Sequence, residues 1–312
     1  MLSRRNVRVK VMQSLYAMNR DKELSFFQVK KNYFLSVGQS YDIYLFNLWI
    51  LGRIADFSRA ELSRKRSKYL PSEEDMAFKD DLATNPISAL LIRSQELSKE
   101  CKDLGISTNI DADNIRKLYK EFEESDPYKE YLKRTAVTTE EHVQILLDLY
   151  KFCINHELFV DMIEDRYFTW LDDKSIVVGS VKRTIKALPI SEEDFFKAYK
   201  PDLETTEEFG LELMEYVHEN SADLESIIEP MLENWEMNRV AVLDMIILKM
   251  AIAEILIFPT IPTKVSLNEY VDLSKLYSTD KSKEFINGVL DRTVKKLVKE
   301  NKIQKEGRGL ID

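Results

Sequence analysis

Apolar positions along this chain recur every three or four residues, which is the spacing of one helix face. The pattern is clearest in two late segments, whose matching positions are Leu267, Tyr270, Val271, Ser274 and Tyr277, then Ile286, Val289, Leu290, Thr293 and Leu297. Between them, Thr279 and Asp280 are residue types that cap helix N-termini, so we predict a helix, a tight turn and a second helix. Pro259 and Pro262 mark a loop between two further helical segments.

The same periodicity continues through the middle of the chain. Residues 41–54 and 143–167 are apolar and aromatic at helical spacing, and no segment shows sustained two-residue alternation bounded by turns. The sequence therefore predicts an all-α protein. We expect loops at 71–86, 105–113 and 172–174, where proline, glycine or a run of charges interrupts the pattern.

Composition agrees with a folded helical protein. The chain has 312 residues, of which 44% are hydrophobic, with only 8 Gly and 8 Pro, so it can bury one large core or two modest ones and is poor in turns. It has no apolar run of membrane-spanning length, and it begins with arginines rather than with a signal segment. We therefore expect a cytoplasmic location and no membrane partner.

The residues that usually carry catalysis are sparse. Cys101 and Cys153 are too few for a disulfide framework and are expected to be buried thiols, while the histidines His142, His156 and His218 are far apart. No glycine-rich phosphate loop or nucleophile elbow occurs, and His156 three residues after Cys153 is far more typical of a packed or surface histidine. The sequence favours a protein that is not an enzyme and needs no metal or cofactor.

Charge is distributed unevenly. The net charge of -9 argues against indiscriminate coating of nucleic acid, but residues 1–20 contain five basic residues and no acid, whereas 204–236 is strongly acidic. On a helix, Arg5, Arg8 and Tyr16 share one flank, and the positions that would face the core are Val7, Val11, Leu15 and Met18. A solvated basic end and a site for single-stranded RNA explain this flank equally well.

Two segments carry a resemblance to a known family. Residues 262–292 read PTKVSLNEYVDLSKLYSTDKSKEFINGVLDR, and residues 4–16 read RRNVRVKVMQSLY. The first resembles the signature of the NusB family of bacterial transcription antitermination factors without a gap. The second is similar to the family's arginine-rich first helix. Two matches in the expected order make RNA the favoured interpretation of the basic flank.

The resemblance implies a small helical factor that binds boxA RNA together with NusE, a small-subunit ribosomal protein, in an antitermination complex on RNA polymerase. Carried over by position, the RNA-facing candidates are Arg4, Arg5, Arg8, Gln13, Tyr16, Lys264, Lys281, Ser282 and Phe285. A basic ribosomal protein would suit an acidic face in the second half, and the candidates there are Glu225, Glu229, Glu233, Glu236 and Asp244. Gly288, which also matches, is expected to allow close helix approach. Whether the protein forms a homodimer stays open.

The resemblance also suggests how the chain is divided. We expect the arginine-rich helix at 1–24, a helical insertion or enlarged first half at 25–204, the second family half at 205–300 and a polar tail at 301–312. A shift of 65 residues places Trp170 on Trp235, which leaves a duplicated helical region as an alternative origin of the insertion.

Two other functions compete with this one. A NusB-like domain also precedes the catalytic domain of a ribosomal RNA methyltransferase, but no methyltransferase motif follows residue 291 here. A helical protein-protein interaction module that has lost RNA binding is the stronger alternative, because the insertion is large and the net charge negative.

Overall fold

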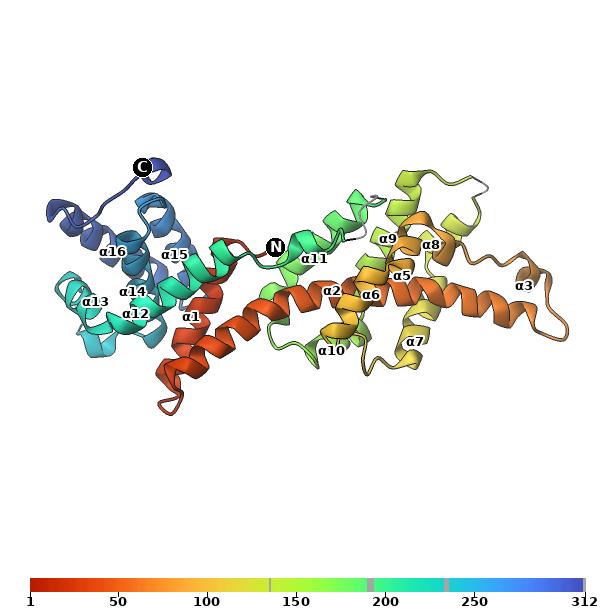
Figure 1. Ribbon diagram of the computed structural model, residues 1–312, viewed down its shortest axis with the longest axis horizontal. Helices are drawn as coiled ribbons and strands as arrows, with labels where there is room; N and C mark the ends of the chain where they lie inside the picture. The colour runs from red at the N-terminus through yellow and green to blue at the C-terminus, as the bar shows by residue number, and fades with distance from the viewer. Residues whose placement is uncertain (135, 190–193, 233–235, 311–312) are drawn as a thin grey trace. The chain divides into compact units, whose positions relative to one another are not determined.

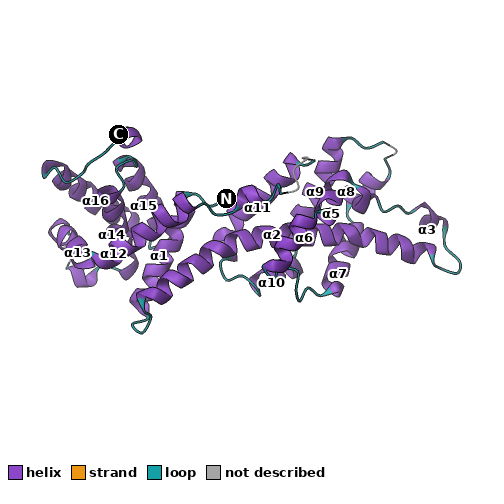
Figure 2. Ribbon diagram, in the orientation of Figure 1, coloured by secondary structure: helices purple, strands orange, loops and turns teal. Residues whose placement is uncertain are grey.

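The computed structural model describes residues 1–134, 136–189, 194–232 and 236–310. Within these ranges the secondary structure consists of helices, with no strand (Figures 1 and 2). The all-α prediction is therefore confirmed. None of the described helices is long and apolar enough to cross a membrane.

The chain forms two compact units. Unit 1 contains Met1 and Gly38–Lys200, and unit 2 contains Leu2–Val37 and Pro201–Asp312. Helix α2 (Phe26–Arg66) contributes its start to unit 2 and the remainder to unit 1.

Unit 2 is built around helix α14 (Val242–Ile257), whose residues 246–255 are all buried. A helix that is apolar on every side needs neighbours all round. The elements packed against α14 are α1 (Arg4–Arg20), α12 (Glu212–Glu219), α13 (Ser221–Ile228), α15 (Thr263–Tyr277) and α16 (Ser282–Lys299). Shorter helical turns complete the unit: the π-helix η2 (Glu204–Leu211) and the 3-10 turns η3 (Glu229–Met231), η4 (Met237–Arg239) and η5 (Gly307–Leu310).

Helix α1 packs on elements from the second half of the chain. Val7, Val11 and Leu15 are buried, and the helix contacts η2, α14 and α12. The expected apolar face is therefore the face that docks, and residues from the two ends of the sequence share one core.

The start of α2 also belongs to this core, although the expected insertion began at residue 25. Val29, Tyr33 and Val37 are buried in unit 2, and the Tyr33 hydroxyl donates to the Thr206 carbonyl at 2.7 Å. Gly210 lies against the same ring, because a Cβ there would come 2.0 Å from the Tyr33 hydroxyl and 2.4 Å from a Val7 methyl. The first segment of unit 2 therefore extends through the apolar face of residues 26–37 and does not stop at residue 24, where the sequence placed the end of the arginine-rich segment.

Unit 1 surrounds the later part of α2. That part is buried almost all round, including Ile43, Tyr44, Leu45 and Phe46 in succession. The other elements of the unit are α3 (Glu73–Ala77), α4 (Asp81–Thr84), α5 (Pro86–Arg93), α6 (Gln95–Asp103), α7 (Ala112–Glu123), α8 (Asp126–Leu132), α9 (Thr139–Ile154), α10 (Glu157–Glu164), α11 (Trp170–Ala187) and η1 (Lys197–Tyr199).

Two loop predictions are wrong in unit 1. Residues 71–86 contain the short helices α3 and α4, and residues 172–174 lie in the first turns of α11. Asp172 and Asp173 favour that place because the free amides at a helix N-terminus attract negative charge. The partner of Trp170 in the suggested duplication, Trp235, lies outside the described residues.

The cysteines and His156 have structural surroundings. Cys101 and Cys153 are buried free thiols, and burial raises the pKa of Cys101 to about 12. His156 is the N-cap of α10: its Nδ1 accepts from the Leu158 amide, and its Nε2 lies 2.8 Å from a Glu121 carboxylate oxygen. The imidazole is therefore engaged with the α10 backbone and α7 rather than with the Cys153 sulfur.

Gly210→Ala should destabilise unit 2 by about 1–3 kcal/mol, because the new methyl overlaps the Tyr33 hydroxyl in a packed core. Gly288→Ala on α16 is the matched control. A Cβ there would be 3.6 Å from the Arg292 guanidinium, an ordinary contact with a flexible side chain, so the expectation that Gly288 allows close helix approach is wrong. The control should be neutral or more stable by up to about 1 kcal/mol. Thermal unfolding followed by circular dichroism checks both, and equal melting temperatures for the two variants would contradict the Gly210 packing.

Candidate nucleic-acid interface

Helix α1 begins at Arg4, directly after its N-cap Ser3, which places three arginines in its first turns. Ser3 is the N-cap, and its hydroxyl and amide both bond the Asn6 side chain, at 2.7 and 3.2 Å. Arg4 and Arg5 therefore lie in the first turn, and Arg8 follows one turn later. Cations at a helix N-terminus oppose the macrodipole, so nearby carboxylates are needed to stabilise them.

Arg8 has a buried carboxylate as its partner. Its Nε and Nη2 donate to Glu254 at 2.7 and 2.6 Å, and the Glu254 side chain is fully buried within α14. The same carboxylate accepts the hydroxyls of Ser266 at 2.7 Å and Tyr270 at 2.8 Å, both from α15. Two charges and two hydroxyls thus satisfy one another where α1, α14 and α15 meet.

Arg8 and Tyr270 both keep their protons across the ordinary pH range. Burial alone would lower the pKa of Arg8, but the hydrogen bonds and charge of Glu254 outweigh it and raise the pKa above its ordinary value. Burial, and then the charge of Glu254, raises the pKa of the Tyr270 phenol. Arg8 remains a cation and Tyr270 remains a hydroxyl donor.

The expectation that Arg8 shares a solvent-facing flank with Arg5 needs correction. Its side chain is only 4% exposed, and its guanidinium also lies over the rings of Phe209 and Tyr270. The long Arg8 side chain can bend around the helix from the flank of Arg5 towards α14. It does so because a fully buried carboxylate such as that of Glu254 is stable only beside a cation. Arg8 therefore holds the fold together instead of facing solvent.

Arg4 and Arg5 keep exposed guanidinium groups. Arg4 bonds Glu204 at 3.1 Å, and Arg5 lies 3.8 Å from Glu269 and 3.7 Å from Asp272. The Arg4–Glu204 pair is a hydrogen bond between exposed side chains, and the two Arg5 pairs are longer contacts with partly exposed carboxylates, so these pairs contribute little to stability. Both arginines line an open groove of about 620 Å³ whose other walls include Ser3, Arg8, Thr260, Ile261, Pro262, Val265, Glu269 and Arg308. The groove combines exposed positive charge with an apolar floor.

The remaining first-helix candidates do not line this groove. Tyr16 is 40% exposed, about 17 Å along the helix axis from Arg5 at 1.5 Å per residue. Gln13 is half-buried beside it, and Lys264 is exposed in the first turn of α15. The structure thus brings Arg4 and Arg5 together along the groove, and Gln13, Tyr16 and Lys264 do not line it.

The RNA-binding candidates of α16 and the turn before it line a second pocket. Lys281, Ser282 and Phe285 line it together with Asp244 of α14, Arg239, Val240, Ala241 and Thr279. Ser282 is buried, and its hydroxyl donates to Asp244 at 2.8 Å, while Ser278 donates to the same carboxylate at 2.5 Å. The predicted capping by Thr279 or Asp280 is wrong, since Lys281 occupies the N-cap position of α16 and makes no side-chain cap. The Ser278 and Ser282 hydroxyls thus connect this turn and α16 to α14 through Asp244.

Comparison with known proteins covers the later part of the chain. The model of the NusB family matches residues 180–295, most of which lie in unit 2. A protein of Listeria monocytogenes named transcription antitermination protein NusB is 38% identical over 104 residues, which are 33% of this chain and 81% of that protein. The chain belongs to the NusB family.

Two further relatives of the NusB family carry the same name. The protein from Salinibacter ruber is 37% identical over 34% of this chain and 67% of its own length. The protein from Chloroherpeton thalassium is 40% identical over 34% of this chain, which spans only 50% of that relative. No solved structure gives a significant match. The family match starts at residue 180 and does not include α1. The arginine helix nevertheless packs in unit 2 against η2, α12 and α14, which lie within the matched residues.

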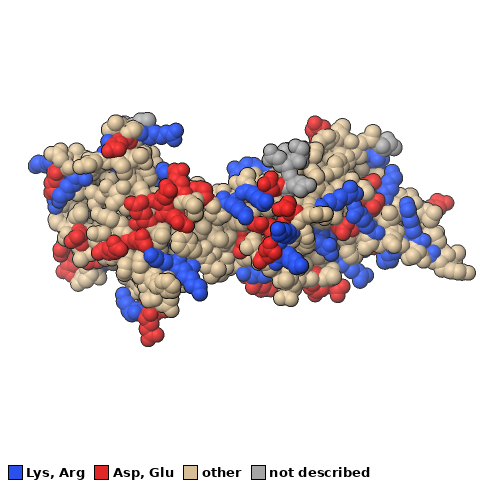
Figure 3. All heavy atoms as spheres, in the orientation of Figure 1, with Lys and Arg blue, Asp and Glu red and all other residues tan. Residues whose placement is uncertain are grey.

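Of the acids expected to meet a partner, Asp244 does not lie on an exposed face. Asp244 is buried under Ser278 and Ser282, and Glu225 accepts from Lys249 at 2.5 Å. Glu229 and Glu236 are exposed, although Glu236 lies 3.5 Å from Arg239, and Glu233 lies outside the described residues. Acidic side chains gather instead over η2 and α12 on the face that Figure 3 shows.

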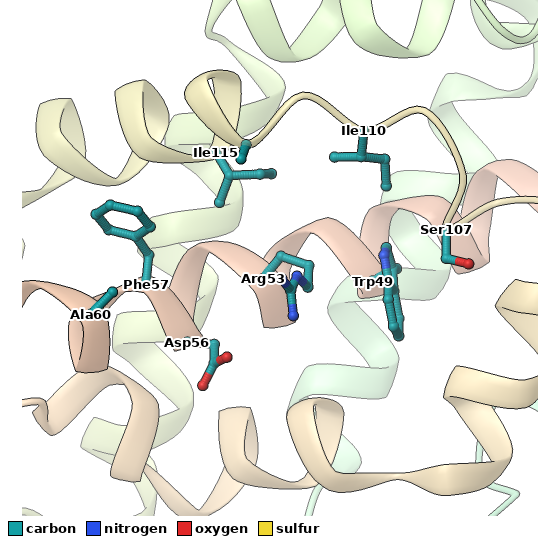
Figure 4. A pocket seen from close by; sticks show the side chains of 9 residues that line it. Trp49, Arg53, Asp56, Phe57, Ala60, Ser107, Ile110 and Ile115 are labelled. Atoms are coloured by element: carbon teal, nitrogen blue, oxygen red, sulfur yellow. The ribbon is translucent and has the colours of Figure 1, made fainter.

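Unit 1 has a pocket of its own, which lies outside the residues that the NusB model matches (Figure 4). It has a volume of about 400 Å³ and is lined by Trp49, Arg53, Asp56, Phe57, Ala60, Ser107, Ile110, Ala112 and Ile115. No sequence pattern indicated this pocket, because its walls come from α2 and from the segment that leads into α7. Among the described residues, no group of three acidic, histidine or cysteine side chains could hold a metal ion.

Changing only one partner of the Arg8–Glu254 pair should destabilise the protein strongly. Arg8→Met should cost about 3–5 kcal/mol, because the fully buried Glu254 charge loses its counter-ion, and Glu254→Gln should cost less, because Glu269 still lies 3.5 Å from the Arg8 guanidinium. The double variant should recover much of this loss, since the introduced amide can still bond the Ser266 and Tyr270 hydroxyls. Chemical denaturation of the four proteins gives the coupling energy. Additive losses in the double variant would mean that the two side chains do not stabilise each other.

Proposed function

We propose that this chain is an RNA-binding transcription antitermination factor, which binds boxA-like single-stranded RNA together with NusE and supports antitermination of ribosomal RNA transcription. The proposal is carried by one observation: Arg4 and Arg5 line an open groove beside the exposed apolar surface of Val265. A guanidinium group can donate two parallel hydrogen bonds to the oxygens of one phosphate, and apolar surface accommodates unstacked bases.

The loose pairing of Arg4 and Arg5 supports the exchange of partners on binding. Their carboxylate partners Glu204, Glu269 and Asp272 lie 3.1–3.8 Å away in partly exposed positions. A phosphate can replace such a carboxylate at small cost, because exposed ion pairs are worth at most about 1 kcal/mol.

Family membership supports the role in antitermination. The relatives named above are transcription antitermination proteins, and unit 2 contains most of the region that the family model matches in this chain. NusE, as a basic ribosomal protein, suits an acidic surface, and Glu229 and Glu236 are the exposed described members of the set expected there. The assembly would then act on RNA polymerase in the cytoplasm.

The double change Arg4→Ala/Arg5→Ala should weaken binding to a boxA-like oligonucleotide and reduce its dependence on salt. Each phosphate contact on a single strand contributes a slope of about 0.7 in the plot of log affinity against log salt, so the magnitude should fall by about 1.4. The fold should remain intact because both side chains are exposed. Fluorescence anisotropy over a series of salt concentrations, with and without NusE, measures the effect.

Arg20→Ala/Lys295→Ala is the matched control, because it removes two exposed cations of unit 2 that do not line the groove. It should leave the slope nearly unchanged, and NusE binding should survive both double changes. If Arg4→Ala/Arg5→Ala leaves affinity and slope as in the unchanged protein, the basic end is only a solvated surface. The alternative function, a helical protein-protein interaction module without RNA binding, would then be preferred.

A further inference from the structure

The segment that follows α16 is folded back onto unit 2 rather than left as a polar tail. Asn301 takes a positive φ of 53°, and the Lys302 amide donates to the Leu297 carbonyl at 2.9 Å. This is the Schellman arrangement that ends a helix and turns the chain sharply. The turn sends residues 303–310 back towards the loop between α14 and α15.

Backbone and side-chain bonds fix this segment on that loop. The Lys305 ammonium donates to the Ile255 and Phe258 carbonyls, each at 3.0 Å, and so neutralises the carboxyl end of α14. The Glu306 amide donates to the Pro259 carbonyl, also at 3.0 Å. A cation and an amide on successive residues thus anchor the segment just before Arg308.

The two glycines beside Arg308 are required by the geometry. Gly307 has a φ of +53°, a conformation that side chains disfavour. Gly309 is buried, and a Cβ there would come 1.9 Å from the Pro259 carbonyl oxygen. The backbone therefore lies directly on the α14–α15 loop, and Arg308 is the side chain that projects from this close contact.

Arg308 lines the same groove as Arg4 and Arg5. It is exposed, and no ion-pair partner is found for it among the residues that the structure describes. The groove also contains Arg8, whose charge Glu254 neutralises, and Glu269, which faces Arg5 and Arg8. Of the arginines in the groove, Arg308 is thus the one whose charge no described carboxylate offsets.

We propose that Arg308, held in place by the docked segment 301–310, binds a phosphate of the same single-stranded RNA that Arg4 and Arg5 contact. The inference rests on the proposed function and extends the site to a part of the chain beyond the family match, which ends at residue 295. A strand in the groove then has guanidinium groups from both ends of the sequence beside it. Ile261, Pro262 and Val265 form the apolar floor under its bases.

The test compares variants of the full chain with a boxA-like oligonucleotide over a series of salt concentrations. Arg308→Ala should weaken binding about three- to tenfold at low salt and lower the magnitude of the salt slope by about 0.7, the value of one phosphate contact. Lys302→Ala is the matched control, because it removes one exposed cation from the same segment outside the groove, and it should change neither quantity.

Gly309→Ala tests the docking itself. The added methyl cannot fit against Pro259, so the segment should leave the loop, and affinity and slope should fall as for Arg308→Ala while unit 2 stays folded by circular dichroism. Full affinity and slope for Arg308→Ala, with binding still dependent on Arg4 and Arg5, would overturn this inference alone. Full binding by Gly309→Ala would refute the role of the docked segment. Absence of RNA binding by the unchanged protein would refute the inference and the proposed function together.

Discussion

The buried pair of Arg8 and Glu254 is the interaction on which unit 2 depends. It joins residues 246 positions apart in the sequence and brings α1, α14 and α15 to one point through the Ser266 and Tyr270 hydroxyls. Neither charge could be buried alone, because an unpaired ion in a core costs several kcal/mol. Docking of the first helix is therefore specified by charge as well as by the apolar face of Val7, Val11 and Leu15.

This closure explains how unit 2 accommodates unit 1 between the two parts of its own sequence. The chain leaves unit 2 after Val37 and returns at Pro201, and the contact of Tyr33 with Thr206 and Gly210 holds these two points together. The entropic cost of a connection grows only slowly with its length, so a large insertion between two fixed ends is a small burden. Unit 1 also has its own hydrophobic core around α2, and this core can stabilise unit 1 independently of unit 2.

Helical periodicity predicted the all-α fold and the docking face of α1, because both follow from apolar spacing along a single segment. The same spacing could not tell that Arg8 turns inward, since that depends on a carboxylate on a distant helix. One signal was available: Glu254 stands inside the apolar run 246–255, and a carboxylate there needs a cationic partner. Asp244 was likewise expected at the surface because its hydroxyl partners, Ser278 and Ser282, lie in another turn. Arg308 carried no sequence signal, since only the docked segment brings it to the groove.

The arginine cluster of α1 thus divides into a structural member, Arg8, and two members proposed to bind RNA, Arg4 and Arg5. The most direct measurement is the salt dependence of boxA-like RNA binding by the Arg8→Met/Glu254→Gln protein, in which the buried pair is neutral. We expect the same slope of log affinity against log salt as in the unchanged protein, because Arg8 holds no phosphate. A slope smaller in magnitude by about 0.7 would mean that Arg8 contacts the RNA, and would contradict this division.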